Sequence, residues 1–254
     1  MSAVKASAFD PAALVQHCVK LAAARRFRVE RIGEVAGCPL VALTRRTPGP
    51  RPRIYLSTGV HGDEPAPPQA LAQLLEHGVF DERADWFLVP MLNPTGFHRG
   101  TRENAAGVDL NRDYKDRRTA EVTAHVHWLE RQPLFDLALC LHEDWEAKGF
   151  YLYELNPEGR PTLADAIIAA ARVHSPIEDA AVIDGRQADA PGIIRPVNDP
   201  LLREDWPEAI YLRAHHARLG YTFETASTQS VEQRVATLAA AVGAAISMIT
   251  APAV

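Results

Sequence analysis

The sequence predicts an α/β protein with a mostly parallel sheet, and two observations lead to this fold class. Short apolar runs alternate with segments of helical periodicity, and the order strand, helix, strand occurs more than once. No internal repeat or low-complexity linker divides the 254 residues. At this length, with 47% hydrophobic residues, the chain can build one sizeable core, so we expect a single domain over residues 1–254.

The first elements follow from capping residues and glycines. Asp10 is a suitable N-cap and Pro11 fits the first helical position, which predicts an opening helix over residues 10–26. Residues 27–37 and 39–46 alternate apolar and polar side chains around glycines, and this pattern indicates a hairpin at the sheet edge.

The centre of the sheet is predicted from apolar runs on either side of a helical segment. RIYLSTGV (53–60) and WFLVPMLN (86–93) flank a helix expected at 65–77, as in the crossover unit of a parallel sheet. The later elements expected in chain order are a helix at 120–130, strands at 135–142 and 151–155, a helix at 163–174, a strand at 221–227 and an Ala-rich C-terminal helix. Residues 93–113 and 176–206 fit neither periodicity, and loops of this length usually serve a function.

The charge balance argues against nucleic acid and membranes as partners. The chain carries 27 basic and 32 acidic side chains, a net charge of −5, and so lacks a basic field for a phosphate backbone or an anionic bilayer. It has no long apolar span and no N-terminal signal segment, and we expect a cytoplasmic protein. Cys18, Cys38 and Cys140 are widely spaced without C-x-x-C, which predicts reduced, mostly buried thiols and no cysteine zinc site.

Polar residues directly after apolar strands are the candidates for chemistry, because open parallel sheets bind ligands beyond the carboxyl ends of their strands. His61 and Glu64 follow such a strand at H-x-x-E spacing, and Gly62 lets the chain turn so that both reach one ion. His142 ends another strand, and two imidazoles with one carboxylate make a zinc site with an open position, a catalytic pattern. The alternative is that His61 and Glu64 merely cap the helix that follows.

Other titratable residues have more ambiguous roles. Glu224 ends the strand YTFE and could serve as a general base beside zinc-activated water, although alone it would be a surface or ion-paired residue. Glu143 and Glu154 are the next candidates for that role. His98 is a weaker candidate for a substrate contact, and the remaining histidines, His125 among them, are expected at the surface or in helix packing.

The loop NPTGFHRGTRENAAGVDLNRDY has the residue types that bind a carboxylate. Its candidates are Arg99, Arg102, Asn111 and Arg112. A guanidinium fork with a primary amide suits a planar carboxylate, and Asp109 and Asp113 could hold Arg112 from either side. The alternative is a solvated basic loop, which accounts poorly for the interleaved glycines.

Together these residues resemble the zinc carboxypeptidase family of the carboxypeptidase A type. Its pattern is H-x-x-E, then N-P-x-G with a following arginine and D-x-N-R, then a histidine and a glutamate at strand ends, and here it covers residues 53–226. N-P-x-G followed by GVDLNR is the more specific part. The chain looks most like the bacterial murein peptide amidase and succinylglutamate desuccinylase-like branch.

The resemblance implies a mixed, roughly eight-stranded sheet between helices and a role for each motif residue. One zinc ion per chain would be bound by His61, Glu64 and His142. Asn111 and Arg112 would hold the terminal carboxylate, Arg102 (rather than Arg99) would polarise the scissile carbonyl, and Glu224 would be the general base. Tyr211 is the nearest candidate for the lid tyrosine that binds substrate in the digestive enzymes.

Three functions compete on this basis. The leading one is a zinc metallocarboxypeptidase that hydrolyses the C-terminal amide bond of a peptide. An N-acyl amino acid deacylase of the aspartoacylase or succinylglutamate desuccinylase type shares fold and metal but releases an acyl group. A non-catalytic binding protein is the third, and the presence of Glu224 with all three presumptive ligands argues against it. Serine or cysteine hydrolysis is weaker still, because G-x-S-x-G is missing and Cys140 lies inside an apolar run.

Overall fold

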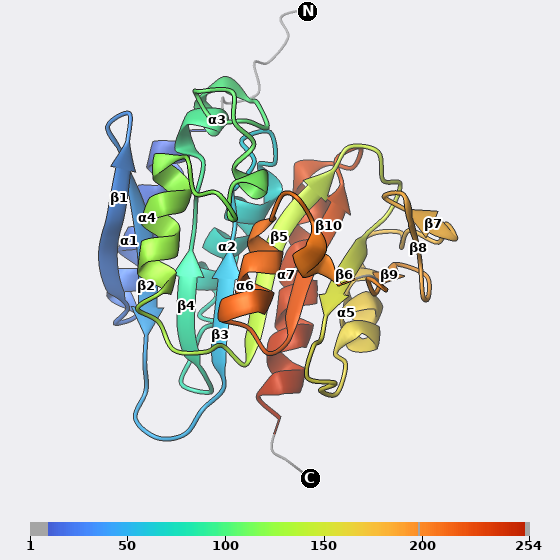
Figure 1. Cartoon of the computed structure of the whole chain (residues 1–254). Coiled ribbons are helices and arrows are strands. Elements are labelled where there is room, and N and C mark those ends of the chain that lie inside the picture. The colour runs from blue at the N-terminus through green and yellow to red at the C-terminus, as the bar shows by residue number, and fades with distance from the viewer. Residues whose placement is uncertain (1–9, 198, 252–254) are drawn as a thin grey trace, which may run out of the picture.

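A central sheet of eight strands, in the order β1-β2-β4-β3-β5-β10-β6-β9, organises the chain (Figure 1). The computed structural model describes residues 10–197 and 199–251. The strands of the sheet are β1 (Arg28–Val35), β2 (Cys38–Arg45), β3 (Arg53–Ser57), β4 (Asp85–Val89), β5 (Leu137–Asp144), β6 (Tyr151–Leu155), β9 (Ile193–Ile194) and β10 (Gly220–Ala226). β7 (Val182–Ile183) and β8 (Arg186–Gln187) pair separately as a small hairpin.

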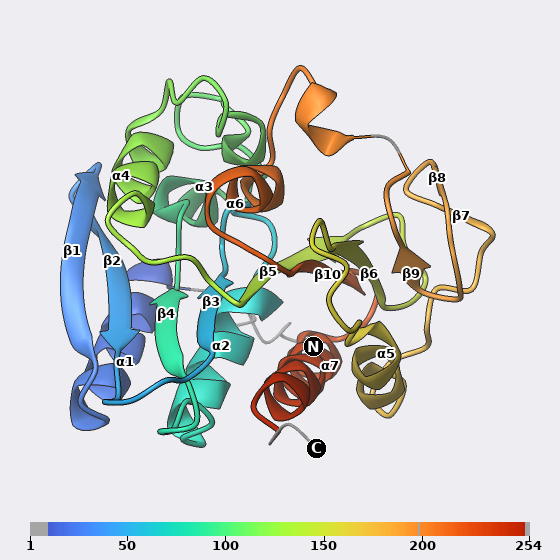
Figure 2. The same cartoon turned by 60° about the horizontal axis from the view of Figure 1, so that its bottom comes forward.

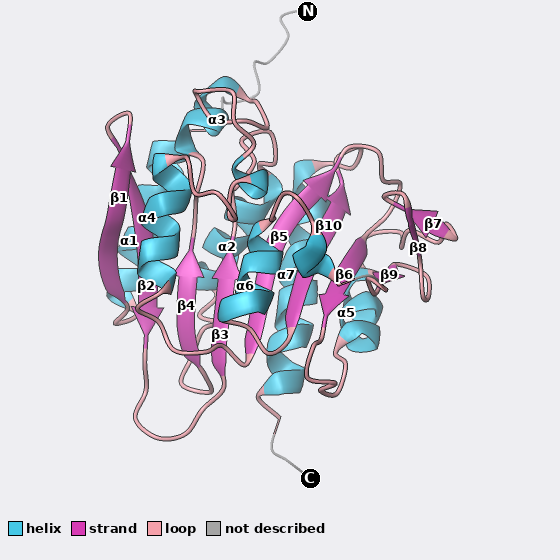
Figure 3. Ribbon diagram, viewed as in Figure 1, coloured by secondary structure: helices cyan, strands magenta, loops and turns pink. Residues whose placement is uncertain are grey.

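Helices lie on both faces of this sheet, as Figure 2 shows. The helices are α1 (Pro11–Ala24), α2 (Ala66–Glu76), α3 (Pro94–Arg99), α4 (Ala120–Leu129), α5 (Ala164–Ala171), α6 (Glu208–His215) and α7 (Val231–Ile249). The larger apolar core lies between one face of the sheet and α1, α2, α5 and α7. A second core packs α4 and α6 against the other face. The layered arrangement and mixed sheet confirm the predicted fold class (Figure 3).

The expected elements form for the expected local reasons. Asp10 caps α1 by accepting hydrogen bonds from the backbone N–H groups of Ala12 and Ala13. The hairpin of β1 and β2 lies at the sheet edge, and its turn residues Ala36 and Gly37 have φ of 50° and 79°, as a tight hairpin turn requires.

Four neighbouring strands, β4, β3, β5 and β10, run parallel. Their carboxyl ends therefore meet at one edge of the sheet, the edge where ligands bind in open α/β folds. The register of β5 and β10 places Glu224 directly opposite His142. Two strand-end residues that are 82 positions apart in the sequence thus become neighbours.

The two segments expected as loops contain short elements. In the first, the side chain of Asn93 accepts a hydrogen bond from the Gly96 N–H at 2.8 Å, Pro94 begins α3, and Gly100 ends it at φ 63°. In the second, β7, β8, β9 and a 3-10 turn (Pro200–Leu202) occur. These strands are two residues long, too short for an alternating pattern to reveal.

Two further expectations concern thiols and membranes. Cys18, Cys38 and Cys140 are free, and Cys18 and Cys140 are buried. Burial raises the pKa of the Cys140 thiol well above its usual range, which makes it a poor nucleophile. Over residues 10–197 and 199–251, no helix has both the length and the apolar character needed to cross a bilayer.

Candidate active site

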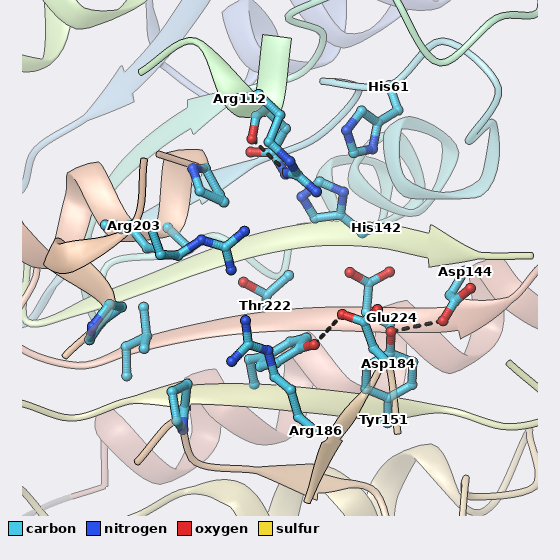
Figure 4. A pocket seen from close by; sticks show the side chains of 18 of the residues that line it. His61, Arg112, His142, Asp144, Tyr151, Asp184, Arg186, Arg203, Thr222 and Glu224 are labelled. Carbon is cyan, nitrogen blue, oxygen red and sulfur yellow. Dashed lines mark hydrogen bonds between the residues drawn. The ribbon is translucent and has the colours of Figure 1, made fainter. Parts of the chain in front are cut away.

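A cavity of about 750 Å3 lies at the edge of the sheet where β3, β5 and β10 end. Side chains from all three strand ends and from the two long connecting segments point into it (Figure 4). The residues predicted from the motifs that line it are His61, Glu64, Arg102, Asn111, Arg112, His142 and Glu224. Residues more than 160 positions apart in the sequence thus share one cavity.

Three buried side chains form a group with the geometry of a metal site. Nδ1 of His61 lies 2.5 Å from one oxygen of Glu64, and Nδ1 of His142 lies 3.1 Å from the other. One ligand atom from each of the three residues lies within 4.8 Å of the others. Two imidazoles and one carboxylate are a donor set that suits zinc and leaves a coordination position open. The residues present therefore fit a catalytic zinc ion.

The charges in this group favour a cation. Burial opposes ionisation of Glu64, but His61 and His142 outweigh it and lower the pKa of the Glu64 carboxyl to about 2. Burial likewise opposes protonation of His61, but Glu64 and Asp109 outweigh it and raise the pKa of the imidazole to about 9. Glu64 and Asp109 therefore stabilise positive charge on His61. A metal ion bound here would take the place of the imidazole proton, since ligation requires the neutral imidazole.

The alternative that His61 and Glu64 only cap α2 does not hold in this structure. The N-cap of α2 is Pro65, and no side chain of that residue or its predecessors caps the helix. The first free N–H, on Ala66, instead donates to Glu143 at 2.6 Å. Glu143 also pairs with Arg234 of α7. The residue after His142 therefore connects β5 both to the start of α2 and to α7.

The loop that carries His61 packs directly against α3. A Cβ atom built on Gly62 would lie 2.0 Å from the carbonyl carbon of Gly96. Two carbon atoms at that separation overlap, so no side chain fits at position 62. A Cβ on Gly96 would in turn lie 2.4 Å from Nδ2 of Asn93, the side chain that caps α3. The glycines of HGDE and NPTG are therefore required by close backbone approach.

Asp109 connects the metal group to Arg102. Its Oδ1 lies 3.2 Å from Nε2 of His61, and its Oδ2 accepts from Nε of Arg102 at 2.9 Å. Arg102 also lies 3.8 Å from Glu64 and lines the cavity. Arg99, in contrast, donates to the carbonyl of Ala105 and is not among the lining residues. The geometry therefore favours Arg102 over Arg99 as the arginine near the reacting group.

Asn111 and Arg112 lie beside each other in the cavity wall. Oδ1 of Asn111 accepts from the backbone N–H of Glu208 at 2.9 Å, so its amide N–H groups are the end left for a ligand. Arg112 donates to the carbonyl of Asn111. The expectation that Asp109 and Asp113 hold Arg112 from either side is wrong.

Those two carboxylates have other partners. Asp109 bonds His61 and Arg102, while Asp113 accepts from Thr119 and Arg118. The guanidinium of Arg112 consequently forms no salt bridge within the described parts of the chain, although its charge helps to lower the pKa of the Asp109 carboxyl. An arginine left in this state is available to an anionic ligand.

Glu224 lies on β10, opposite His142, and points into the cavity (Figure 4). Burial raises the pKa of its carboxyl to about 8; His142 opposes the shift, and the carboxylate of Glu64 adds to it. No arginine or lysine among the described residues pairs with it. A partly buried acid whose pKa lies near neutrality is a candidate for proton transfer.

Tyr211 does not lie where the resemblance suggested. It is 2% exposed and packs between Tyr114 and His215 in the core under α6. Ala209 and Ile210 line the cavity, and Tyr211 follows about 100° further round the helix, away from it. The expectation that Tyr211 contacts substrate is therefore contradicted. His98 is also not among the lining residues.

Sequence reasoning missed several residues of the cavity. The principal ones are Asp144, Tyr151, Asp184, Arg186, Arg203 and Thr222. Thr222 could have been found, because it lies two positions before Glu224 on a strand and so faces the same side. Arg186 and Arg203 lie in segment 176–206, where no local pattern signals which side chains point inward.

The sequence matches one family model over most of its length. Residues 50–246 match the Succinylglutamate desuccinylase/Aspartoacylase catalytic domain. No curated protein shows significant sequence similarity to this chain.

Several solved structures share the fold. A candidate metallopeptidase from Shewanella amazonensis is 25% identical with a TM-score of 0.79, over 93% of this chain and 92% of that one. Another from Shewanella denitrificans is 23% identical with a TM-score of 0.81, over 94% and 90%. A metallo-carboxypeptidase from Burkholderia cenocepacia is 21% identical with a TM-score of 0.67, over 92% of this chain and 67% of that one.

The matched segment begins before β3 and ends within α7, so it includes the metal group, the arginine loop and Glu224. The chain belongs to the succinylglutamate desuccinylase/aspartoacylase catalytic domain family.

Proposed function

We propose that the protein is a zinc-dependent metallocarboxypeptidase that hydrolyses the C-terminal amide bond of a peptide. The observation that carries the proposal is one cavity that holds a His-Glu-His group, an acid that no described arginine or lysine pairs with, and an arginine that forms no salt bridge with a described carboxylate. Family membership and the metallopeptidase-like fold support the coarser statement that this is a metal-dependent hydrolase.

Each residue has a role in this mechanism. His61, Glu64 and His142 would hold zinc, which when bound supplies a positive charge that acidifies water and polarises a carbonyl. Glu224 takes the proton of the attacking water and delivers it to the leaving nitrogen.

The substrate is positioned by the arginine loop. Arg102, fixed by Asp109, donates N–H groups toward the carbonyl oxygen as negative charge develops there. Arg112 and the amide of Asn111 bind the terminal carboxylate in a charge-assisted contact. Because Asn111 is fixed by Glu208, its N–H groups are oriented before substrate arrives.

The other candidate bases are engaged elsewhere. Glu143 pairs with Arg234 and accepts from the N–H of Ala66. Glu154 accepts hydrogen bonds from Tyr221 and from Arg195, and these bonds, with that of Thr162, lower the pKa of its carboxyl despite the opposing effect of burial. Glu224 is thus the best-suited proton acceptor in the cavity.

A deacylase of N-acyl amino acids is the second candidate, and the family match favours it. The cavity favours a peptide, because about 750 Å3 leaves room for more than one amino acid. Trp145 lines the same cavity and is 76% exposed, so it offers an apolar contact to a longer substrate.

A substrate panel tests the proposal. Purified protein loaded with zinc is offered short free-acid peptides, the same peptides with an amidated C-terminus, and N-acetyl and N-succinyl amino acids. Release of the C-terminal residue from the free-acid peptides, abolished by a chelator and restored by zinc, is expected. Hydrolysis confined to the acyl amino acids would establish the deacylase instead.

A further inference from the structure

Two residues of the metal group come from separate segments of the chain. Glu64 lies just before α2, and His142 lies in β5, 78 positions further along the sequence. Their side chains meet at 3.1 Å, between Nδ1 of His142 and a carboxylate oxygen of Glu64. Behind them, one hydrogen bond joins the two segments, because Oε1 of Glu143 accepts from the backbone N–H of Ala66 at 2.6 Å.

Ala66 is the anchoring point that the sequence leaves at the start of α2. The other three residues of segment 65–68 are prolines, which have no backbone N–H to donate. No side chain of the N-cap residue satisfies the first turn of α2, so the carboxylate of Glu143 caps the helix from a neighbouring strand. A shift of Glu143 would therefore shift the start of α2, and Glu64 with it.

Arg234 of α7 holds the other oxygen of Glu143 in a salt bridge. The two residues are 8% and 5% exposed, and α2 and α7 pack on the same face of the sheet. Glu143 lies at the wall of the cavity, but both of its oxygens are engaged in this way. Among the described residues Arg234 forms no other salt bridge, and its Nε is buried without a hydrogen-bond partner.

Stability alone does not account for this buried pair. The cost of removing two charges from water offsets much of their attraction, and apolar residues of similar volume often give an equally stable fold. The unpaired Nε of Arg234 adds to that cost. What a guanidinium does better than an apolar side chain is to hold a carboxylate in one orientation.

We propose that Glu143 and Arg234 are positioning residues for the metal site. Arg234 orients the carboxylate of Glu143, and that carboxylate sets the separation of Glu64 and His142. Ligands that are already held at the binding distance need not be ordered when the ion arrives, so zinc binds more tightly. The inference rests on the zinc assignment in the proposed function, and it holds for a peptide substrate or an acyl amino acid alike.

Two double variants test the inference through zinc affinity, measured by competition with a chromophoric chelator. Glu143→Met with Arg234→Met removes both charges together, so no lone charge stays buried and the fold should persist. The N–H of Ala66 then lacks its acceptor, and zinc affinity should fall about 10- to 100-fold. Glu143→Gln with Arg234→Met keeps an amide oxygen for that N–H, and it should bind zinc about tenfold more tightly than the first variant.

A control pair lies at the opposite end of the sheet. Arg45 pairs with Glu82 at 2.6 Å near the start of β4, and Arg45→Met with Glu82→Met should leave zinc affinity unchanged. The urea midpoint of the zinc-free protein is recorded for every variant. Wild-type zinc affinity in the Met/Met variant of the buried pair would overturn the inference. Equal affinities in the two variants of that pair would do so too, as would a loss of affinity that only follows a loss of stability in the zinc-free protein.

Arg234→Lys decides the question if the Met/Met variant does not fold. Lysine keeps the charge but lacks the planar fork, so the carboxylate is held less firmly and zinc affinity should still fall. An unchanged affinity would overturn the inference.

These measurements separate the inference from the proposed function, because they need no substrate. Peptide hydrolysis together with wild-type zinc affinity in all variants of the buried pair would overturn the positioning role and leave the peptidase proposal standing. The expected losses of affinity in a protein that cleaves no peptide would support the positioning role, although the peptidase proposal would then fail.

Discussion

Nε2 of His61 lies 3.2 Å from Oδ1 of Asp109, on the side of the ring opposite the contact with Glu64. A carboxylate in this position fixes the tautomer and orientation of a ligating histidine, and removing it typically costs about 10- to 100-fold in metal affinity. We expect that loss in Asp109→Asn, measured by competition with a chromophoric chelator. Asn can still cap the turn that follows, so the fold should persist. An unchanged affinity for zinc would show that Asp109 positions Arg102 but does not orient His61.

The metal ligands can be tested by composition. Elemental analysis of the purified protein should find about one zinc per chain, since three ligands complete one catalytic site. His61→Ala and His142→Ala should each reduce the bound zinc to a small fraction. His77→Ala, at the exposed end of α2, is the matched control and should keep the wild-type content. Full zinc content in either ligand variant would refute the assignment.

Glu224→Gln isolates the proton-transfer role. The amide keeps the shape of the side chain but cannot take a proton, so turnover should fall about 100- to 10,000-fold. Zinc content and melting temperature should stay close to wild type, because no described arginine or lysine pairs with Glu224. An active Gln variant would move the base to another residue.

Arg112→Ala tests recognition of the terminal carboxylate. A charge-assisted hydrogen bond contributes about 1.5–3 kcal/mol, so kcat/KM on a free-acid peptide should fall about ten- to a hundredfold or more. The amidated peptide never makes this contact, and the substitution should matter little for it. If both peptides suffer equally, Arg112 stabilises the loop rather than the substrate.

His125 gives the folded protein a pH-dependent stability. It is fully buried between the hydroxyls of Tyr55 and Tyr114, and burial lowers the pKa of its imidazole from 6.5 to about 3. Between these values the unfolded chain binds a proton that the folded chain does not, so the free energy of unfolding falls as pH falls, by about 1.4 kcal/mol per unit.

Urea unfolding at pH 7 and pH 5 checks this effect. Wild type should lose about 2 kcal/mol more than His125→Gln over that interval, since Gln hydrogen-bonds without titrating. Equal losses in the two proteins would mean that His125 is protonated in the fold.

The candidate metal ligands and the candidate base could be predicted because each is marked by its local sequence. His142 and Glu224 end apolar runs, and the parallel register of β5 and β10 then places them side by side. His61 and Glu64 lie in one short motif. Strand ends in a parallel sheet meet at one edge, so position along a strand is enough to gather these side chains.

Two cavity-lining arginines, Arg186 and Arg203, could not be predicted, because their positions depend on the path of irregular backbone. Arg186 follows a turn in which Asp184 and Gly185 adopt φ of 46° and 66°, and Arg203 follows a three-residue turn. No periodicity reports which way such a side chain points. Tyr211 shows the reverse problem, since its helix was not anticipated and one helical step separates it from the cavity-lining Ile210.

The contact between Gly62 and Gly96 limits how this site can be altered. These residues lie 34 positions apart, in the loop of the first histidine and in α3. The backbone of Gly96 leaves no room for a carbon added to Gly62, and Asn93 leaves none for a carbon added to Gly96. Loop exchange between relatives would have to transplant HGDE and NPTG together, because either segment alone would meet a mismatched surface. A mutational library that randomised one of them would recover few functional clones, and the loss would come from steric overlap rather than from altered chemistry.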